Sequence, residues 1–480
     1  MPDELTRLTA RQTVAKLKSG EVSPLDLIDA AAARIESVDQ KVNALPTLCL
    51  DRARDRAGKI MQDGPKDRGP NDLAGLPIAV KDLNHVEGVR NTQGSPIFAD
   101  DISDHSDFMV EQLEANGALV VAKSNTPEFG AGANTFNEVF GRTCNPWGLQ
   151  KNPGGSSGGS AAALATGQVW LATGSDLGGS LRIPAAYCSI VGMRPTPGRV
   201  SSGPGALPFG PLSVDGPMAR NVGDVALMLD AQAGPHPLDP ISLQTEAPGF
   251  FQAAVDEPVS PKRIAFSPDL GYVPVDAETA DICETAARRF VDLGAEVEAA
   301  CPDLRDAEET FDILRAEQYA AGKQPLLESH RDQLKPEVIW NIEHGLAMTA
   351  EVIGRGERMR GAMFNRLATF FQTYDYLLTP TVITAPFDGE IRYLEELNGH
   401  KFESYVSWLI MTFAFSAFSL PSISIPCGFT REGLPVGLQI VGRPRDDAGV
   451  LGAASLLEEA LGLADLVPIE PRDTPQPVST

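Results

Sequence analysis

The sequence predicts an α/β protein in which helices cover a largely buried sheet. Two observations predict this class: apolar residues recur at helical spacing in long segments, and short apolar runs typical of strands alternate with those segments. Residues 76–80 form an apolar run, residues 108–116 a helical pattern, and residues 118–122 a second apolar run. This order of strand, helix and strand is typical of α/β architecture.

The other elements follow from local signals. Residues 6–63 show helical periodicity, with Ser23-Pro24 as a cap and first-turn signal, and the Gly-, Pro- and charge-rich stretch 63–72 predicts a loop. The further expected elements are helices at 160–166, 336–374 and 447–460, and strands at 168–173, 376–379, 422–425 and 437–441. We expect one large single domain with four regions: 1–65 (helical), 66–235 (the catalytic core), 236–375 (an α/β insertion or substrate-covering region) and 376–480 (returning to the core sheet).

Composition narrows the classes of partner. The 480 residues are 42% hydrophobic, which suits a globular chain, and the formal net charge is -24. Because basic patches attract nucleic acid and anionic lipid, we expect neither as a partner. The sequence has no run of ~18 apolar residues and no apolar stretch behind a basic start, so we expect no membrane span and a cytoplasmic location.

The cysteines and histidines predict neither a disulfide framework nor a metal centre. The six cysteines are scattered without a C-x-x-C pair, and the six histidines show no H-x-H or H-E-x-x-H spacing. We therefore expect reduced thiols, no cofactor and no metal. Cys144 and Cys188 flank the motifs described next, so a nucleophilic thiol stays an alternative.

Residues 153–162, PGGSSGGSAA, are the strongest local signal for a site. Four glycines around Ser156 and Ser157 permit close backbone approach, and the loop feeds a helix start whose free N–H groups point outward. A phosphate-cradling loop fits less well, because no Lys-Ser or Lys-Thr pair ends the run. A purely structural turn stays an alternative.

Two further signals accompany this loop. Residues 174–185, GSDLGGSLRIPA, place Ser180 in a second glycine-rich loop whose N–H groups can converge on an anion, and Pro184 suits the first turn of a following helix. Lys81 ends an apolar strand beside Asp82, although a solvated strand end is the ordinary explanation of such a lysine.

The predicted topology brings the three signals to one edge of one sheet. A helix leaving from Ser156 is followed by the strand 168–173 running back, so the loop with Ser180 returns beside Ser156. Lys81 also lies at the carboxyl end of its strand, which is the edge where open α/β sheets place their sites.

The motifs LPIAVKD, PGGSSGGSAA and GSDLGGSLRIPA, in this order, resemble the amidase-signature family of serine amidohydrolases. The resemblance extends through residues 420–444 and is loose only over about residues 235–375. It implies a mixed, mostly parallel twisted sheet with helices on both faces. It also implies hydrolysis of the C–N bond of a small-molecule amide without a cofactor, and the homodimer that is common in the family.

The resemblance assigns roles to the motif residues. Ser180 corresponds to the nucleophile, Ser156 to a bridging serine that follows a cis peptide bond after Gly155, and Lys81 to the base. Further correspondences are an oxyanion hole made by the N–H groups of Leu177, Gly178, Gly179 and Ser180, substrate contacts of Gly130 and Ser156, and bracing of the site by Asp176 and Arg182.

These residue types suit the chemistry. Serine is a poor nucleophile until a base removes its proton, and a lysine is a base only when it is neutral, which requires desolvation. Asp82 would oppose a neutral Lys81 if the two side chains faced each other. Adjacent strand residues point to opposite faces, so we expect that they do not.

Three alternatives stay open. Residues 155–159 fit G-x-S-x-G, so Ser157 could be the nucleophile of an α/β-hydrolase with a downstream histidine, which leaves Ser180 and Lys81 unexplained. The glutaminase (A) subunit of the glutamyl-tRNA(Gln) amidotransferase resembles the chain in all three motifs. It typically differs at residues 126–129, 177 and 183, which favours a free-standing amidase. A non-catalytic scaffold is the third alternative.

Aromatic and apolar residues outside the motifs predict an apolar substrate pocket that favours aryl or alkyl amides, unless these residues are simply core. They are Tyr319, Trp340, Tyr405, Trp408, Met411, Phe413 and Phe415.

Overall fold

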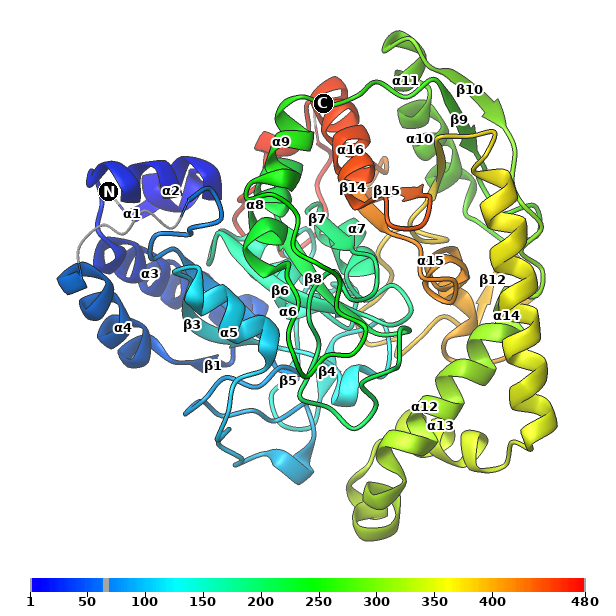
Figure 1. The fold of residues 1–480 in the computed structure, drawn as a ribbon, viewed down its shortest axis with the longest axis horizontal. Coiled ribbons are helices and arrows are strands. Elements are labelled where there is room, and N and C mark those ends of the chain that lie inside the picture. Colours follow the sequence, from blue (N-terminus) through cyan, green and yellow to red (C-terminus); the bar gives the residue numbers. More distant parts are fainter. Residues whose placement is uncertain (1, 64–68, 479–480) are drawn as a thin grey trace.

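One large sheet forms the centre of the molecule (Figure 1). The computed structural model describes residues 2–63 and 69–478, so part of the expected loop 63–72 lies outside the described residues. Eleven strands follow the order β1-β3-β2-β6-β8-β7-β14-β15-β11-β9-β10. Their bounds are β1 (Thr47–Leu48), β2 (Pro77–Lys81), β3 (Leu119–Ser124), β6 (Leu171–Asp176), β7 (Val191–Arg194), β8 (Val214–Ala219), β9 (Arg263–Phe266), β10 (Glu296–Ala299), β11 (Tyr376–Pro380), β14 (Ser422–Phe429) and β15 (Pro435–Gly442).

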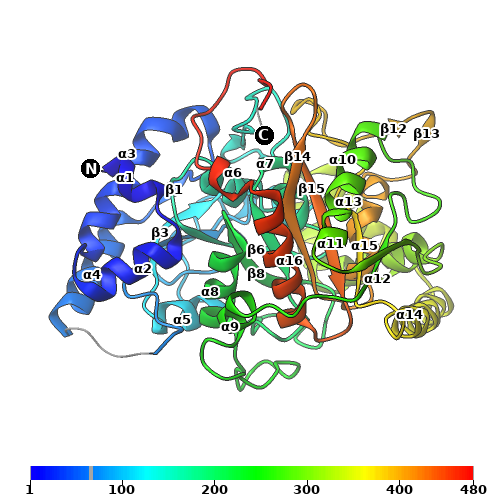
Figure 2. The same cartoon turned by 90° about the horizontal axis from the view of Figure 1, so that it is seen from above.

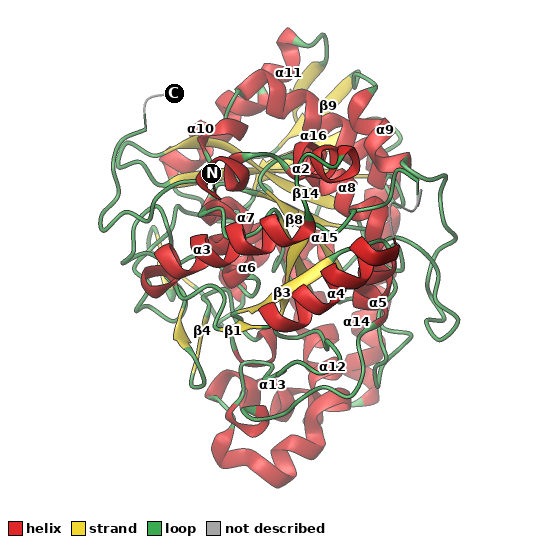
Figure 3. Ribbon diagram, turned by 90° about the vertical axis from the view of Figure 1, so that its left-hand side faces the viewer, coloured by secondary structure: helices red, strands yellow, loops and turns green. Residues whose placement is uncertain are grey.

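Helices surround the sheet, as the colours of Figure 3 show. Their bounds are α1 (Pro2–Arg7), α2 (Ala10–Ser19), α3 (Pro24–Val42), α4 (Leu50–Asp63), α5 (Phe108–Ala115), α6 (Gly158–Ala165), α7 (Arg182–Cys188), α8 (Val222–Gln232), α9 (Phe250–Asp256), α10 (Ala277–Ala287), α11 (Arg289–Asp292), α12 (Ala307–His330), α13 (Pro336–Leu346), α14 (Ala350–Phe370), α15 (Ile410–Ser416) and α16 (Asp447–Leu461). The N-terminal helices α1–α4 lie at one end of the sheet and α12–α14 at the other (Figure 2). Two small sheets, β4 (Phe136–Asn137) with β5 (Gly141–Arg142) and β12 (Glu396–Leu397) with β13 (His400–Lys401), lie apart from it.

The expected mixed α/β sheet is confirmed, and its parallel pairs form two groups. β2 pairs in parallel with β3 and β6, and β9 pairs in parallel with β10 and β11. The pairs that join the two groups, from β6 through to β11, are antiparallel. For β14 and β15 the reason is the short connection 430–434, since parallel strands require a long crossover. Strands from all four regions of the sequence enter this one sheet.

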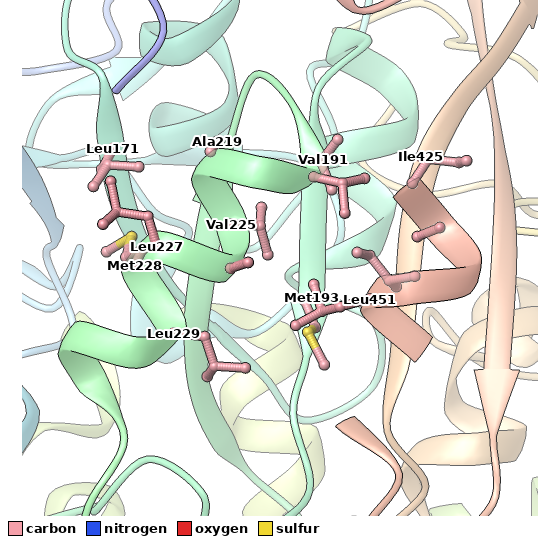
Figure 4. Close-up of a cluster of buried hydrophobic side chains, with 14 of the residues drawn as sticks. Leu171, Val191, Met193, Ala219, Val225, Leu227, Met228, Leu229, Ile425 and Leu451 are labelled. Carbon is pink, nitrogen blue, oxygen red and sulfur yellow. The ribbon is translucent and has the colours of Figure 1, made fainter. Parts of the chain in front are cut away.

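Helices cover both faces of the sheet. Leu171 on β6 packs in a cluster with Val225 of α8 and Leu451 of α16, which Figure 4 shows. The adjacent residue Ala172 packs instead in a cluster with Ala161 of α6 and further residues of α7. Because successive strand side chains point to opposite faces, the two clusters are the two faces of the sheet.

Local signals located most elements. Ser23 caps α3 through its side chain, which accepts the N–H of Asp26, and the expected strand at 76–80 and helix at 108–116 are present as β2 and α5. The expected helical region 6–63 is interrupted by β1, which pairs with β3. This pairing is a tertiary contact, and a two-residue strand leaves no periodicity in the sequence.

Two expected boundaries are wrong. The strand expected at 168–173 runs instead from Leu171 to Asp176, because its register is fixed by antiparallel pairing with β8 along its whole length. The helical stretch expected over 336–374 consists of two helices, α13 and α14. The chain leaves the helical conformation after Leu346, and α14 begins after its N-cap residue Thr349, whose side chain accepts the N–H of Val352.

No helix in the described ranges is both long and apolar enough to pass through a lipid bilayer.

Candidate active site

Lys81 ends a strand in the interior of the sheet. Its strand β2 lies between β3 and β6, and the Lys81 side chain is 0% exposed. Ile78 and Val80 point into the cluster under α8, whereas Ala79 points to the face covered by α6. Two-residue alternation therefore directs Lys81 to the α6 face, where the loop with Ser156 lies.

The Ser156 loop meets the Lys81 amine directly. Lys81 Nζ lies 2.7 Å from Ser156 Oγ, 2.9 Å from Ser157 Oγ and 3.0 Å from Ser175 Oγ. The Gly155–Ser156 peptide bond is cis, as the resemblance implies. A neutral amine has two N–H donors and one lone pair, so two of the three hydroxyls can accept from it while the third donates to it.

Burial makes Lys81 a base at neutral pH. Desolvation lowers the pKa of Lys81 to about 7, although the carboxylates of Asp215 and Asp176 act in the opposite direction. Asp82 does not face the amine: its carboxylate lies 3.0 Å from Lys123 Nζ and accepts the hydroxyl proton of Thr92. The expectation that Asp82 and Lys81 point apart is confirmed.

Asp176 holds the loop that carries Ser180. Its carboxylate accepts the N–H of Gly179 at 2.8 Å and that of Leu181 at 3.2 Å. Arg182 donates to the same carboxylate through Nε at 3.0 Å and Nη2 at 2.9 Å. Burial raises the pKa of Asp176, but the guanidinium groups of Arg182 and Arg194 outweigh it, and the net pKa lies far below the ordinary value.

The backbone donors near Ser180 differ from the expectation in one respect. The N–H groups of Leu177, Gly178 and Ser180 have no hydrogen-bond acceptor within the described part of the chain, so they are available to a ligand. The N–H of Gly179 is engaged by Asp176. Of the four N–H groups expected to form an oxyanion hole, three are therefore without a protein acceptor, because the carboxylate that fixes the loop accepts the N–H of Gly179.

These residues open into one cavity of about 70 Å³. Ser156, Ser175 and Ser180 line it, together with Leu83, Phe129, Gly130, Gly132, Leu177, Gly178, Ser213, Phe311, Arg315, Tyr319, Val406 and Leu409. Gly130 has φ +69, and a Cβ there would lie 3.2 Å from Ser156 Oγ. A side chain at this position would therefore crowd the serine, which explains the glycine.

Sequence reasoning missed several lining residues. Ser175 lies inside a motif, and its contact with Lys81 follows from the parallel pairing of β2 and β6. Phe311 and Arg315 reach the cavity from α12, and no local pattern distinguishes them from core residues. Of the seven apolar and aromatic candidates, only Tyr319 lines this cavity; Trp408, Met411 and Phe415 are core residues.

The three rival nucleophiles, Ser157, Cys144 and Cys188, lie outside the cavity lining. Ser157 is 0% exposed, and its hydroxyl contacts Lys81 and the backbone of Ser175. Cys188 is buried, its thiol donates to the carbonyl of Pro153, and burial raises the pKa of that thiol well above its ordinary value. Burial also raises the pKa of Cys144. Neither thiol is therefore activated.

One set of potential metal ligands joins two separate parts of the sequence. The side chains of His85, His105 and Asp107 place their ligand atoms within 4.8 Å of one another, and the two imidazole rings stack at 4.6 Å. Short histidine spacings do not reveal this set, because a loop brings His85 to residues 20 positions further along the chain. None of the three residues lines the cavity that contains Ser180.

Comparison with known proteins places this fold and site in one family. A family profile described as amidase matches residues 26–451. An acylamidase of Rhodococcus erythropolis is 35% identical over 468 residues, which cover 96% of this chain and 97% of the relative. The A subunit of the glutamyl-tRNA(Gln) amidotransferase of Prochlorococcus marinus (strain MIT 9313) is 33% identical over 474 residues, covering 93% of this chain and 96% of the relative.

A solved structure agrees with this placement. The crystal structure of a bacterial aryl acylamidase of the amidase-signature enzymes superposes with a TM-score of 0.88 at 29% identity, covering 97% of this chain and 100% of that one. The fold is an α/β scaffold with a serine–lysine site at the end of a central strand. This chain belongs to the amidase family, and the resemblance inferred from its three motifs is confirmed.

Proposed function

We propose that this chain is an amidase that hydrolyses a carboxylic amide through an acyl-enzyme on Ser180, with Ser156 as the bridge and Lys81 as the base. The observation that supports the proposal is the buried Lys81 amine, 2.7 Å from Ser156 Oγ, beside the cavity that Ser180 lines. Because burial lowers the pKa of Lys81 to about 7, a substantial fraction of this amine is neutral at pH 7 and can accept the proton that Ser156 passes on from Ser180.

The reaction then proceeds in two halves. Ser180 Oγ attacks the amide carbon, and the carbonyl oxygen becomes an oxyanion that the free N–H groups of Leu177, Gly178 and Ser180 stabilise. The proton returns from Lys81 through Ser156 to the nitrogen of the leaving group, so the C–N bond breaks and the amine or ammonia departs. Water, deprotonated by the same relay, hydrolyses the ester on Ser180 and releases the acid.

Labelling with a fluorophosphonate tests the nucleophile. We expect a covalent adduct on Ser180, located by fragmentation of the tryptic peptide 152–182, which also contains Ser157, and loss of both the adduct and amide hydrolysis in Ser180→Ala. An adduct on Ser157, or full activity of Ser180→Ala, would support the α/β-hydrolase alternative. A chain that neither labels nor hydrolyses any amide in a panel of aliphatic, aromatic and cyclic substrates would support the scaffold alternative.

The glutaminase component of the glutamyl-tRNA(Gln) amidotransferase is the second candidate. The 33% identity to a protein of that branch favours it, whereas Leu177 and Ile183 oppose it, because they replace the Thr and Gln typical of the branch. Amide hydrolysis by the purified chain alone supports the free-standing amidase. Glutamine hydrolysis that requires two further co-purifying proteins would support the amidotransferase.

The proposed partner is a small-molecule amide. The cytoplasmic location, the absence of nucleic-acid binding and the homodimer stay predictions. Fractionation of the native host, and sedimentation of the purified chain, would test the first and the last.

A further inference from the structure

Arg315 is a buried cation in the wall of the cavity that contains Ser180. It projects from α12, in the region of the chain that matches the motifs least, and it is 5% exposed. The rings of Tyr319 and Tyr405 lie 4.8 Å and 5.5 Å from its guanidinium carbon. Two aromatic faces therefore hold the guanidinium plane in a fixed orientation.

Within the described residues, Arg315 has only neutral hydrogen-bond partners. Nε donates to Asn341 Oδ1 at 3.1 Å, and Nη2 donates to the hydroxyls of Tyr319, at 3.4 Å, and Tyr405. Nη1 has no acceptor among the described residues, and no described carboxylate lies within 4.0 Å of the group. The third nitrogen of the fork thus has no hydrogen-bond acceptor among the described residues, and Arg315 lines the cavity.

Carboxylates in the surroundings are already engaged. Glu337 accepts two nitrogens of Arg392 at 2.7–2.9 Å. Glu128 accepts the backbone N–H of Lys335 at 2.8 Å. Lys335 adds a second, partly buried cation, which donates to the carbonyl of Ala131 and whose Nζ lies 3.8 Å from the Cβ position of a cavity-lining glycine, Gly132. This end of the cavity therefore carries positive charge that no carboxylate contacts directly.

A buried charge without a counterion is costly, and a cationic fork with a free edge matches a carboxylate. The amide carbonyl that is cleaved has its own donors beside Ser180, so Arg315 serves another group of the substrate. We infer that the substrate of this enzyme carries a carboxylate remote from the scissile amide, and that Arg315 binds this carboxylate and sets the specificity. The inference rests on the amidase function proposed above.

Paired substrates test it. One series consists of 4-nitroanilides of dicarboxylic acids, with one free carboxylate, and the other of neutral 4-nitroanilides of matched length that end in a methyl group. We expect kcat/KM of the unmodified enzyme to favour the carboxylate series by about 10-fold or more, since a hydrogen-bonded charge pair contributes roughly 10- to 100-fold in affinity. Arg315→Gln should remove the preference, mainly by raising KM.

Two further variants define the effect. Arg315→Lys, which keeps the charge and loses the fork, should retain part of the preference. Arg289→Gln, on the exposed helix α11, should leave both series unchanged and serves as the matched control. The neutral series should change by less than about 3-fold in Arg315→Gln, which separates specificity from damage to the catalytic serine.

Each outcome of these measurements either supports or refutes the role of Arg315. An unmodified enzyme that turns over both series equally, or an Arg315→Gln enzyme that keeps the preference, refutes the role of Arg315 while amide hydrolysis stands. If neither series is hydrolysed and Ser180 does not react with a fluorophosphonate, the proposed function itself fails. If the variants do not fold, inhibition of the unmodified enzyme is compared: dicarboxylates must inhibit about 10-fold more strongly than monocarboxylates of the same length, and equal inhibition refutes the inference.

Discussion

The environment of the Lys81 amine, the proposed base, determines its protonation state. It is fully buried, three hydroxyl groups surround it, and burial lowers its pKa to about 7. In water a lysine amine is protonated at this pH and cannot act as a base. Lys81 can be neutral at this pH because the sheet shields it from solvent and because Asp82, its neighbour in sequence, pairs with Lys123 instead.

This pKa predicts the pH dependence of the reaction. Only neutral Lys81 accepts a proton, so kcat/KM should fall about tenfold for each pH unit below about 7 and level off above it. Measurement from pH 5.5 to 9 with a neutral amide checks the prediction, with circular dichroism at each pH as the control for folding. A rate that stays constant down to pH 5.5 would contradict it.

Replacement of Lys81 tests the same relay. Lys81→Ala should lower kcat/KM at pH 8 by about 10³-fold, because general-base catalysis contributes 10²–10⁴-fold. Labelling of Ser180 by a fluorophosphonate should slow in parallel. Lys59→Ala, on the surface helix α4, is the matched control. Lys123→Ala is not suitable as a control, because it leaves Asp82 buried without its partner. Hydrolysis at full rate by Lys81→Ala would end the proposal.

Gly130 limits the space around Ser156. A Cβ at position 130 would lie 3.2 Å from Ser156 Oγ and 3.1 Å from Leu83 Cδ1. Gly130→Ala should therefore lower kcat by roughly 10- to 100-fold, since small displacements of a reacting group are costly. Gly271→Ala is the control, because φ is +81 and no atom lies within 4 Å of its Cβ position. Equal activity of the two variants would show that crowding is absent.

At the scale of elements, the site depends on how the end of β6 connects to α7. The loop between them carries Ser180, and its shape is fixed by one carboxylate that accepts from two backbone N–H groups and two arginines. The carboxylate comes from Asp176, the last residue of β6. Strand pairing with β8 thus sets the position of the loop that carries Ser180, the proposed nucleophile.

Asp176→Asn should disturb both stability and activity. It leaves Arg182 and Arg194 buried without a countercharge, which costs about 3–5 kcal/mol of unfolding free energy, and it frees the loop around Ser180. Urea unfolding and kcat/KM measure the two effects. Asp256→Asn breaks an exposed pair with Arg11 and should cost less than about 1 kcal/mol. If Asp176→Asn is as stable as this control, the bracing role is wrong.

At the scale of the whole molecule, one sheet joins all four regions of the sequence. β1 comes from the first region, β9 and β10 from the third, and β11, β14 and β15 from the last. The cavity joins three of these regions, because its lining comes from residues 83–213, from α12 and from the segment before α15. The side with Ser180 and the side with Arg315 therefore come from different parts of the chain.

This arrangement predicts one cooperative unfolding transition. We expect far-UV circular dichroism and tryptophan fluorescence to follow the same thermal curve, as for a single domain. A chain that ends at residue 375 should not fold, because it lacks β11, β14 and β15 from the middle of the sheet. Two separated transitions, or a folded truncated chain, would instead show independent domains.

The sequence alone determined the family, the α/β class and the three motif residues that meet at the site. These depend on local signals: a strand that ends in Lys81, and glycine-rich loops around Ser156 and Ser180. Glycine permits the backbone conformations that such loops require, so the loops can be recognised from their glycines in the sequence.

The tertiary structure decided what no local pattern encodes. The extent of β6 was set by its partner strand, the N–H of Gly179 was engaged by Asp176, and Arg315 reached the cavity from a helix far away in the sequence. Register, competition between hydrogen-bond acceptors and the isolation of a buried charge all depend on which distant segments lie side by side. Local sequence patterns therefore do not predict these features, because each of them depends on contacts that form only in the folded chain.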